Sequence, residues 1–357
     1  MTSHNPAPTD IDEILDPRWL EAVLYKDFPG VEVTGTEVVE STFNTATKTR
    51  VAVEVRNAPP NLVKTICIKG MLSEVGKLYL ANGVAKTEAL FYQELAEPLS
   101  KHFKLPPCLY AGIDPATNHG LIIMQDLVAA GCTFLQPLTP YTADEAYASL
   151  ESLARLHTTG PEGSALYNTP WLEHTLETRM ARNGLIPPEM LHDLLNGPRG
   201  DPLPKEILDG HRLQRSMGLL ANHFRDEPSS LVHGDAHAGN LYRLPGDQIE
   251  IGLIDWQLIQ QGYWAQDVAY HLGAALSVEN RRKSERDLLA HYLDRLAAFG
   301  GPVIDKDTAW DHYRMAMLYG YYLWGVTRRV DPPIILEFVL RLGTAVADLE
   351  SFKLAEA

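Results

Sequence analysis

Asp235, Asn240 and Asp255 form the pattern of polar residues in this chain that is best suited to chemistry. They lie in the segment LVHGDAHAGNLYRLPGDQIEIGLIDWQ, residues 231–257. Phosphoryl transfer from a nucleoside triphosphate needs a base beside the acceptor hydroxyl and hard oxygen ligands for Mg2+. An aspartate, an asparagine five positions later and a second aspartate at the end of an apolar run can supply these groups. The segment therefore predicts phosphoryl transfer to a hydroxyl group.

Two short apolar runs separate Asn240 from Asp255. Leu241 to Leu244 and Ile249 to Ile254 flank the sequence Pro245-Gly246-Asp247-Gln248, which is typical of a turn. The pattern predicts a β-hairpin. Such a hairpin folds the chain back on itself and can return Asp255 toward Asn240.

A different chemistry is open to part of the same segment. His233, Asp235 and His237 form H-x-D-x-H, which could bind a transition metal in a hydrolase. No further cluster of His or Cys completes such a site in the sequence, and Asp255 has no role in it. Phosphoryl transfer accounts for more of the pattern.

The motif HGDxxxxN followed by IDW resembles the motif pair of aminoglycoside phosphotransferases and of choline- and ecdysteroid-kinase-like enzymes. The resemblance implies an α+β, two-lobed, protein-kinase-like fold: a small N-terminal β-sheet lobe with one key helix, and a larger, mainly helical C-terminal lobe. It implies that His233 and Asp235 belong to the catalytic loop, with Asp235 as the base, and that Asn240 and Asp255 bind Mg2+. Trp256-Gln257, in place of Phe-Gly, is more similar to the small-molecule branch than to protein kinases.

A lysine and a glutamate upstream fit the same resemblance. The alternating apolar run from Leu62 ends in Lys69, and a lysine that points inward needs a negative partner, for which a triphosphate is a candidate. By its place in the chain, Lys69 resembles the lysine that reaches the α and β phosphates of ATP, with Lys64 as the alternative. In the helix predicted from 83 to 99, Glu88 begins a segment similar to the family's E-x-x-F-Y and would pair with the lysine. Glu94 is its competitor.

The nucleotide has two further expected contacts. Residues 31–39 and 49–55 are rich in β-branched side chains and predict strands, with 41–47 as the hairpin loop. In the resembled fold this loop covers the triphosphate, which implicates Phe43 and Asn44; it contains no glycine here, which weakens the assignment of single residues. The base of ATP, or of GTP, is expected to bind backbone groups after the apolar strand that begins at Leu121, namely those of Met124, Gln125, Asp126 and Leu127.

The C-terminal part is predicted to be mostly helical. Thr142 and Glu145 form a capping box before a helix, and closing helices are expected over 305–327 and 332–352. Asp267, at the start of a helix, resembles the aspartate that supports the catalytic loop by hydrogen bonds. In the segment 158–230, which helps to shape the acceptor pocket in the resembled families, the candidates are Trp171, His174 and Arg179.

Length and composition limit the remaining choices. A chain of 357 residues exceeds one core, so we expect residues 1–125 as a nucleotide-binding lobe, with 1–12 disordered, and 126–357 as the catalytic and acceptor-binding lobe. The net charge of −15 argues against nucleic acid as a partner. Three scattered cysteines, no apolar run of membrane length and no signal-like N-terminus favour the cytoplasm.

The acceptor is expected to be a small hydroxylated molecule. Residues 1–125 hold 15 acidic and 11 basic side chains, and the rest hold 31 and 20, so acidity is only slightly denser in the acceptor-binding part. A cationic acceptor is thus permitted but not indicated. The other class that remains is a kinase-like protein that binds ligand without turnover, and the joint presence of Lys69, Asp235, Asn240 and Asp255 argues against it.

Overall fold

The computed structural model describes residues 5–43, 46–60, 62–78, 80, 83–139 and 141–357. The chain divides into two compact units. The first comprises Met1–Lys101, Leu105–Thr133 and Ile254–Leu258, and the second comprises His102–Lys104, Phe134–Leu253 and Ile259–Ala357. The sequence predicts a boundary after residue 125, whereas the first unit continues to Thr133 and also takes in the short segment around Asp255.

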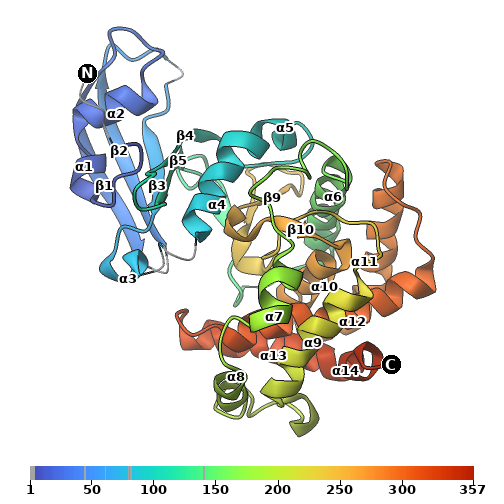
Figure 1. Cartoon of the computed structure of the whole chain (residues 1–357). Helices are drawn as coiled ribbons and strands as arrows, with labels where there is room; N and C mark the ends of the chain where they lie inside the picture. The colour runs from blue at the N-terminus through green and yellow to red at the C-terminus, as the bar shows by residue number, and fades with distance from the viewer. Residues whose placement is uncertain (1–4, 44–45, 61, 79, 81–82, 140) are drawn as a thin grey trace. The chain divides into compact units, whose positions relative to one another are not determined.

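The first unit is built on a five-stranded antiparallel sheet with the order β1-β2-β3-β5-β4 (Figure 1). Its strands are β1 (Glu32–Phe43), β2 (Thr47–Arg56), β3 (Thr65–Gly70), β4 (Cys108–Ile113) and β5 (Gly120–Gln125). The strands expected at 31–39 and 49–55 are confirmed. Both strands continue into the segment 41–47 that was expected to be the loop, because Phe43 pairs with Thr47.

One face of this sheet is covered by the N-terminal helices α1 (Ile11–Ile14) and α2 (Pro17–Leu24). Trp19 and Leu20 of α2 pack with buried aliphatic residues of the sheet in one core. The chain before α1 also joins this core, since Ala7 is fully buried and the Tyr110 hydroxyl donates to the Pro6 carbonyl at 2.6 Å. Residues 5–12 therefore differ from the expected disordered lead, because they bury apolar side chains against α2 and β4.

The single key helix expected from 83 to 99 consists of three consecutive segments. They are α4 (Val84–Leu90), a π-helical stretch (Phe91–Leu95) and α5 (Ala96–Ser100), after the short α3 (Glu74–Lys77). Helix α4 lies very close to β5. A Cβ atom at Gly120 would stand 2.0 Å from the Ala85 carbonyl oxygen, so only glycine permits this approach.

The second unit is mainly helical. Its helices are α6 (Ala143–Thr159), α7 (Ala181–Asn183), α8 (Pro188–Leu195), α9 (Gly210–His223), α10 (Trp264–Ala275), α11 (Val278–Ala298), α12 (Lys306–Val326), α13 (Pro332–Asp348) and α14 (Ser351–Ala355). The capping box of Thr142 and Glu145 is confirmed. The closing helices are confirmed as α12, α13 and α14, while α11 lies in a stretch to which the sequence analysis assigns no element.

Short strands connect the helices of the second unit. They are β7 (Ser230–Val232), β8 (Leu241–Arg243), β9 (Ile251–Leu253) and β10 (Gln260–Gly262), with β6 (Thr133–Phe134) at the boundary. The predicted hairpin after Asn240 is confirmed, since β8 and β9 pair antiparallel with Leu241 opposite Leu253. Among the described residues, no helix has both the length and the apolar character needed to cross a bilayer.

Candidate active site

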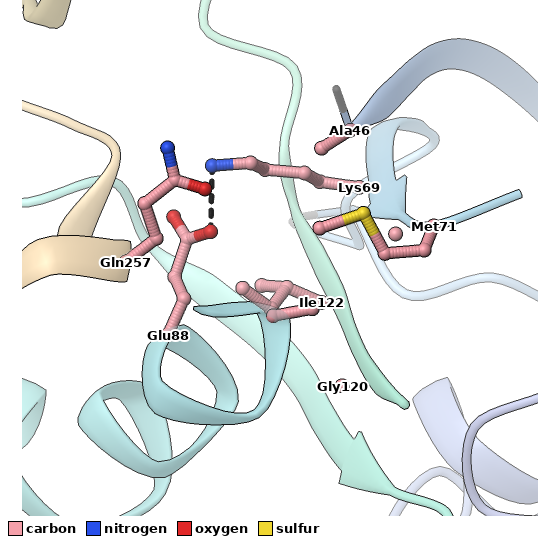
Figure 2. Close-up of a pocket in the computed structure, with 9 residues that line it drawn as sticks. Ala46, Lys69, Met71, Glu88, Gly120, Ile122 and Gln257 are labelled. Atoms are coloured by element: carbon pink, nitrogen blue, oxygen red, sulfur yellow. Dashed lines mark ion pairs between the residues drawn. The ribbon is translucent and has the colours of Figure 1, made fainter. Parts of the chain in front are cut away.

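In the first unit, the Lys69 ammonium lies between two carboxylates. Its Nζ stands 2.6 Å from Glu88 Oε2 and 2.8 Å from Asp255 Oδ1, and Figure 2 shows Lys69 and Glu88 pointing toward each other. The side chains of Lys69 and Glu88 are almost fully buried, and that of Asp255 is 12% exposed. The alternatives Lys64 and Glu94 are both exposed. The sequence analysis favours Lys69 and Glu88 over their alternatives, and the structure pairs Lys69 with Glu88.

The electrostatics of this cluster depend on burial and on charge balance. Burial by itself lowers the pKa of the Lys69 ammonium, but Asp255 and Glu88 outweigh it and hold the pKa above its ordinary value. Burial raises the pKa of the Glu88 carboxyl, and the Lys69 charge acts in the opposite direction. Lys69 is therefore a fixed positive charge, which suits a ligand with negative phosphates.

The local backbone and an aromatic contact hold Asp255 beside Lys69. The Trp256 backbone N–H donates to Glu88 Oε1 at 3.2 Å, and the Trp256 ring stacks on Phe91 with 4.3 Å between centroids. Asp255 itself has a φ of 66°, in the left-handed region that non-glycine residues seldom adopt. Strained positions of this kind persist where the surroundings fix them, and they often belong to functional sites.

Lys48 on β2 is a residue that sequence reasoning missed. It lies opposite Lys69 in the pairing of β2 with β3, and its Nζ is 3.6 Å from Asp255 Oδ2. The signal was available: Lys48 and Arg50 occupy alternate positions of the strand, on the face opposite to buried Thr47 and Thr49. A second cation thus stands beside the same carboxylate.

A small recess opens beside Lys69 and Glu88 (Figure 2). It is small and open to solvent. Its walls come from β3, α4, β5 and the segment around Asp255, and the lining residues are Ala46, Lys69, Gly70, Met71, Ala85, Glu88, Gly120, Ile122 and Gln257. The buried ammonium is thus accessible from a pocket.

The segment expected to bind the nucleobase is held by its own hydrogen bonds. The Asp126 carboxylate accepts from Arg50 Nε at 3.0 Å and from the Val128 N–H at 3.0 Å. The backbone N–H groups of Gln125 and Asp126 donate to the carbonyls of Pro107 and Thr65. The Asp126 side chain therefore shapes the turn that includes Leu127, while Met124 is paired within β5.

The expected loop contacts have different outcomes. Phe43 lies at the end of β1 with 70% of its surface exposed. Asn44 lies outside the described residues. The Phe43 side chain therefore faces mostly solvent.

In the second unit, Asp267 fixes the backbone of the predicted catalytic loop by hydrogen bonds. Its two carboxylate oxygens accept from the backbone N–H groups of His233 at 2.6 Å and Gly234 at 2.8 Å. His157 Nε2 lies 3.2 Å from the same carboxylate. Burial by itself raises the pKa of Asp267, but His157 and the backbone donors hold it below its usual value. Gly234 has a φ of 78°, and this glycine permits the sharp turn that brings Asp235 to the loop surface.

Asp235 and Asn240 meet within this loop. Asn240 Nδ2 donates to the Asp235 carbonyl at 2.9 Å and to Asp235 Oδ2 at 3.1 Å. The other oxygen, Oδ1, accepts from the Tyr270 hydroxyl at 3.0 Å. Because the amide nitrogen of Asn240 is used inside the loop, its amide oxygen is left as an acceptor, and oxygen is the ligand type that Mg2+ prefers.

The histidines of the H-x-D-x-H pattern have loop contacts. His233 is fully buried and its Nδ1 accepts from the Asp235 N–H at 3.2 Å, while His237 Nδ1 accepts from the Gly239 N–H at 3.0 Å. In the part of the chain that the structure describes, no group of three His, Cys, Asp or Glu residues could hold a metal ion. Both histidines therefore shape the loop around Asp235.

The three candidates for the acceptor pocket lie in a partly exposed region of the second unit. His174 Nε2 is 2.9 Å from the Tyr167 hydroxyl, and Arg179 Nε donates to Glu173 Oε2 at 3.2 Å. Trp171 is half-buried beside them in the chain.

The predicted residues thus form two groups. Lys69, Glu88 and Asp255 meet in the first unit, and Asp235 and Asn240 meet in the second unit. The convergence of both groups on one triphosphate stays a prediction.

The two units together define a kinase-like phosphotransferase: one has an antiparallel sheet with a buried lysine–glutamate pair, and the other is helical with a braced aspartate loop. The model of the phosphotransferase enzyme family, known as APH, matches residues 76–316, more than half of the chain. The chain belongs to this family of phosphotransferases. No curated protein matches the sequence significantly.

Solved structures support the same fold. One, described as the GDP and kanamycin complex of APH(2")-IIIa, has a TM-score of 0.52 at 14% identity and covers 92% of this chain and 98% of its own. The GDP complex of wild-type aminoglycoside 2'-phosphotransferase-IIIa has a TM-score of 0.51 at 15% identity, with coverages of 93% and 99%. Choline kinase LicA from Streptococcus pneumoniae is also similar, with a TM-score of 0.48 at 15% identity and coverages of 96% and 99%. The two GDP complexes, with TM-scores above 0.5, confirm the predicted α+β kinase-like fold.

Proposed function

We propose that the protein transfers the γ-phosphoryl group of ATP or GTP to a hydroxyl of a small acceptor molecule, with Asp235 as the base. The observation that carries this proposal is the pair Asp235–Asn240, joined by a 3.1 Å hydrogen bond on a loop that Asp267 holds in place. One carboxylate is thereby fixed at the loop surface, and the amide oxygen beside it is an acceptor. This is what a proton acceptor next to a metal ligand requires.

The residues present fit Mg2+ by the chemistry of their donors. Asn240 directly precedes β8 and Asp255 follows β9, whose paired residues are Leu241 and Leu253. Both supply hard oxygen ligands, and Mg2+ is commonly bound by one or two protein oxygens together with substrate phosphates. When bound, the ion would neutralise charge on the phosphates. The Asp255 carboxylate, which is paired with Lys69, would hold it together with Asn240.

The chain's own residues have separate roles in the proposed reaction. Lys69, kept charged by its two carboxylates, donates hydrogen bonds to phosphate oxygens. Asp235 accepts the proton of the acceptor hydroxyl as the new O–P bond forms and the nucleoside diphosphate leaves. Residues 1–125 would serve mainly the nucleotide and 126–357 the acceptor.

Nucleotide binding is tested by thermal shift with ATP or GTP and Mg2+. GTP is included because two of the matched structures are GDP complexes. A ligand that binds only the native state at about 100 times its Kd adds roughly 2.7 kcal/mol of stability. Asparagine tolerates the left-handed backbone of position 255. We therefore expect the Asp255→Asn variant to fold and to lose the Mg2+-dependent part of this stabilisation.

Turnover is tested with a panel of aminoglycosides, choline-like amines, macrolides and sterol-like alcohols. We expect Asp235→Asn to lower transfer roughly 10²- to 10⁴-fold and to leave nucleotide binding nearly intact. Asp247→Asn, in the exposed turn between β8 and β9, is the matched control. Equal turnover of Asp235→Asn and the parent would reject the base. Binding of nucleotide without any transfer or hydrolysis would instead support a silent binding protein.

The three cysteines are free, which agrees with a reducing compartment, and we propose the cytoplasm as the site of action.

A further inference from the structure

Helix α10 contacts the loop of Asp235 through two side chains that lie one turn apart. The Asp267 carboxylate accepts hydrogen bonds from the backbone N–H groups of His233 and Gly234. The Tyr270 hydroxyl donates a hydrogen bond to Asp235 Oδ1 at 3.0 Å. Residues three apart on a helix share a face. One helix face thus fixes the backbone before Asp235 and also the Asp235 carboxylate itself.

We propose that Tyr270 is a positioning residue for Asp235: it sets the orientation of the carboxylate that accepts the proton. The inference rests on the proposed role of Asp235 as base. Tyr270 touches neither the nucleotide nor the acceptor in this scheme and acts through Asp235 alone.

The direction of the Tyr270 hydroxyl proton is fixed by a second hydrogen bond. The indole N–H of Trp324, on α12, donates to the Tyr270 oxygen at 2.7 Å. An indole N–H can only donate, so the phenol oxygen is the acceptor there and its own proton is directed to Asp235. Burial, and then the neighbouring Asp235 charge, raise the pKa of Tyr270 far above its ordinary value, so the phenol stays protonated.

The Asp235 carboxylate is consequently held at both oxygens. Tyr270 donates to Oδ1, and Asn240 Nδ2 donates to Oδ2 at 3.1 Å. Without Tyr270, rotation of the carboxylate is opposed at only one of these oxygens. A displacement of about 1 Å at a reacting group can lower a rate roughly 100-fold.

The packing of Tyr270 can be separated from its hydroxyl. The ring lies against Tyr319, with 6.0 Å between centroids, and it fills the space over Gly320. Phenylalanine retains these ring contacts and removes only the O–H. Tyr270→Phe is therefore a test of the hydrogen bond.

The experiment measures kcat and KM for nucleotide, Mg2+-nucleotide affinity and Tm of Tyr270→Phe. The reactions are hydrolysis of Mg-ATP and Mg-GTP, and transfer to any acceptor that the panel supplies. We expect kcat to fall roughly 10- to 100-fold while KM for nucleotide, nucleotide affinity and Tm stay close to the parent values. A residue that only stabilised the fold would lower Tm and would not change kcat selectively.

Two further variants make the result decisive. Tyr321→Phe, also buried, removes a hydroxyl that donates to the Ile207 carbonyl, and it is expected to keep the parent kcat. Because Tyr270→Phe leaves the Trp324 N–H without its acceptor, the double variant Tyr270→Phe/Trp324→Phe is measured as well, and it should show the same loss of kcat. An unchanged kcat in both Tyr270 variants would overturn the inference.

The failure of this inference is distinct from failure of the proposed function. If Asp235→Asn abolishes turnover and Tyr270→Phe does not change it, only the positioning role is rejected. If Asp235→Asn keeps the parent rate, or if the parent neither hydrolyses nor transfers, the proposed function is rejected and this inference with it.

Discussion

Replacement of Lys69 by methionine should destabilise the first unit strongly, because it leaves two carboxylates close together without their shared cation. The side chain is 5% exposed, and its Nζ lies 2.6 Å from Glu88 and 2.8 Å from Asp255. Removal of one partner of a buried ion pair costs about 3–5 kcal/mol, mostly because the remaining charge is buried and unpaired. Methionine conserves most of the volume, so the loss reports charge more than packing.

The pH dependence gives this prediction a sign. The pKa of Glu88 is already raised by burial, and removal of Lys69 takes away the charge that opposes the rise. A carboxyl whose pKa is raised in the folded state binds more protons when folded, so stability falls as pH increases above its ordinary pKa. The deficit of Lys69→Met should therefore be larger at pH 8 than at pH 5, by about 1.4 kcal/mol for each unit by which the variant raises the pKa.

The assay is urea denaturation at both pH values, and unfolding is monitored by tryptophan fluorescence. Lys64→Met is the control, since Lys64 is exposed and surface charges contribute little. The double variant Lys69→Met/Glu88→Gln should recover roughly half of the loss or more, because replacement of both partners is far less costly than replacement of one. The reasoning is refuted if Lys69→Met lies within about 1 kcal/mol of the parent at both pH values.

Three further outcomes are expected. We expect Lys48, the second cation beside Asp255, to contact the nucleotide phosphates, so Lys48→Met should raise KM for nucleotide about 5-fold, or ~1 kcal/mol for a cation whose side chain is 35% exposed. An unchanged KM in steady-state kinetics would contradict this contact. Asp267→Asn should lower stability by about 2–4 kcal/mol in denaturant titrations, since an amide nitrogen cannot accept from the loop N–H groups; parent-like stability would exclude the brace. Burial lowers the pKa of His271 to about 4. Between about pH 6.5 and 4 the unfolded chain therefore binds a proton that the folded chain does not, and the free energy of unfolding decreases by roughly 3 kcal/mol as the pH is lowered through this range. His271→Gln should flatten that part of the curve in a pH series of thermal melts, and an unaltered slope would assign it to other groups.

The β8–β9 hairpin and the start of α6 were accessible from the sequence because their constraints are local. Leu241 and Leu253 pair as the apolar runs around the turn predict, and the capping box at Thr142 depends on residues three apart. The preference for Glu88 over Glu94 came from the resemblance alone, since residue types do not say which helix face approaches β3. That approach is set by Gly120, which is distant in the chain.

The contacts of Tyr270 were also beyond sequence reasoning. Its partners Asp235 and Trp324 belong to elements far apart in the chain, and a tyrosine on an apolar helix is ordinarily a core residue. The helix α11 was missed for a different reason. Its first turns, ENRRKSER, are so strongly charged that the apolar repeat at Leu288, Leu289 and Tyr292 is hard to recognise.

The brief return of the chain to the first unit at Ile254–Leu258 affects how the protein can be dissected. A fragment that ends at Thr133 would lack both the second counter-ion of Lys69 and the ring that stacks on Phe91. Such a truncation removes a carboxylate that neutralises the buried Lys69 ammonium of the strand-and-helix module. A separately expressed N-terminal piece would need this pentapeptide restored, by a fused linker or an added peptide, before its nucleotide affinity could represent that of the intact enzyme.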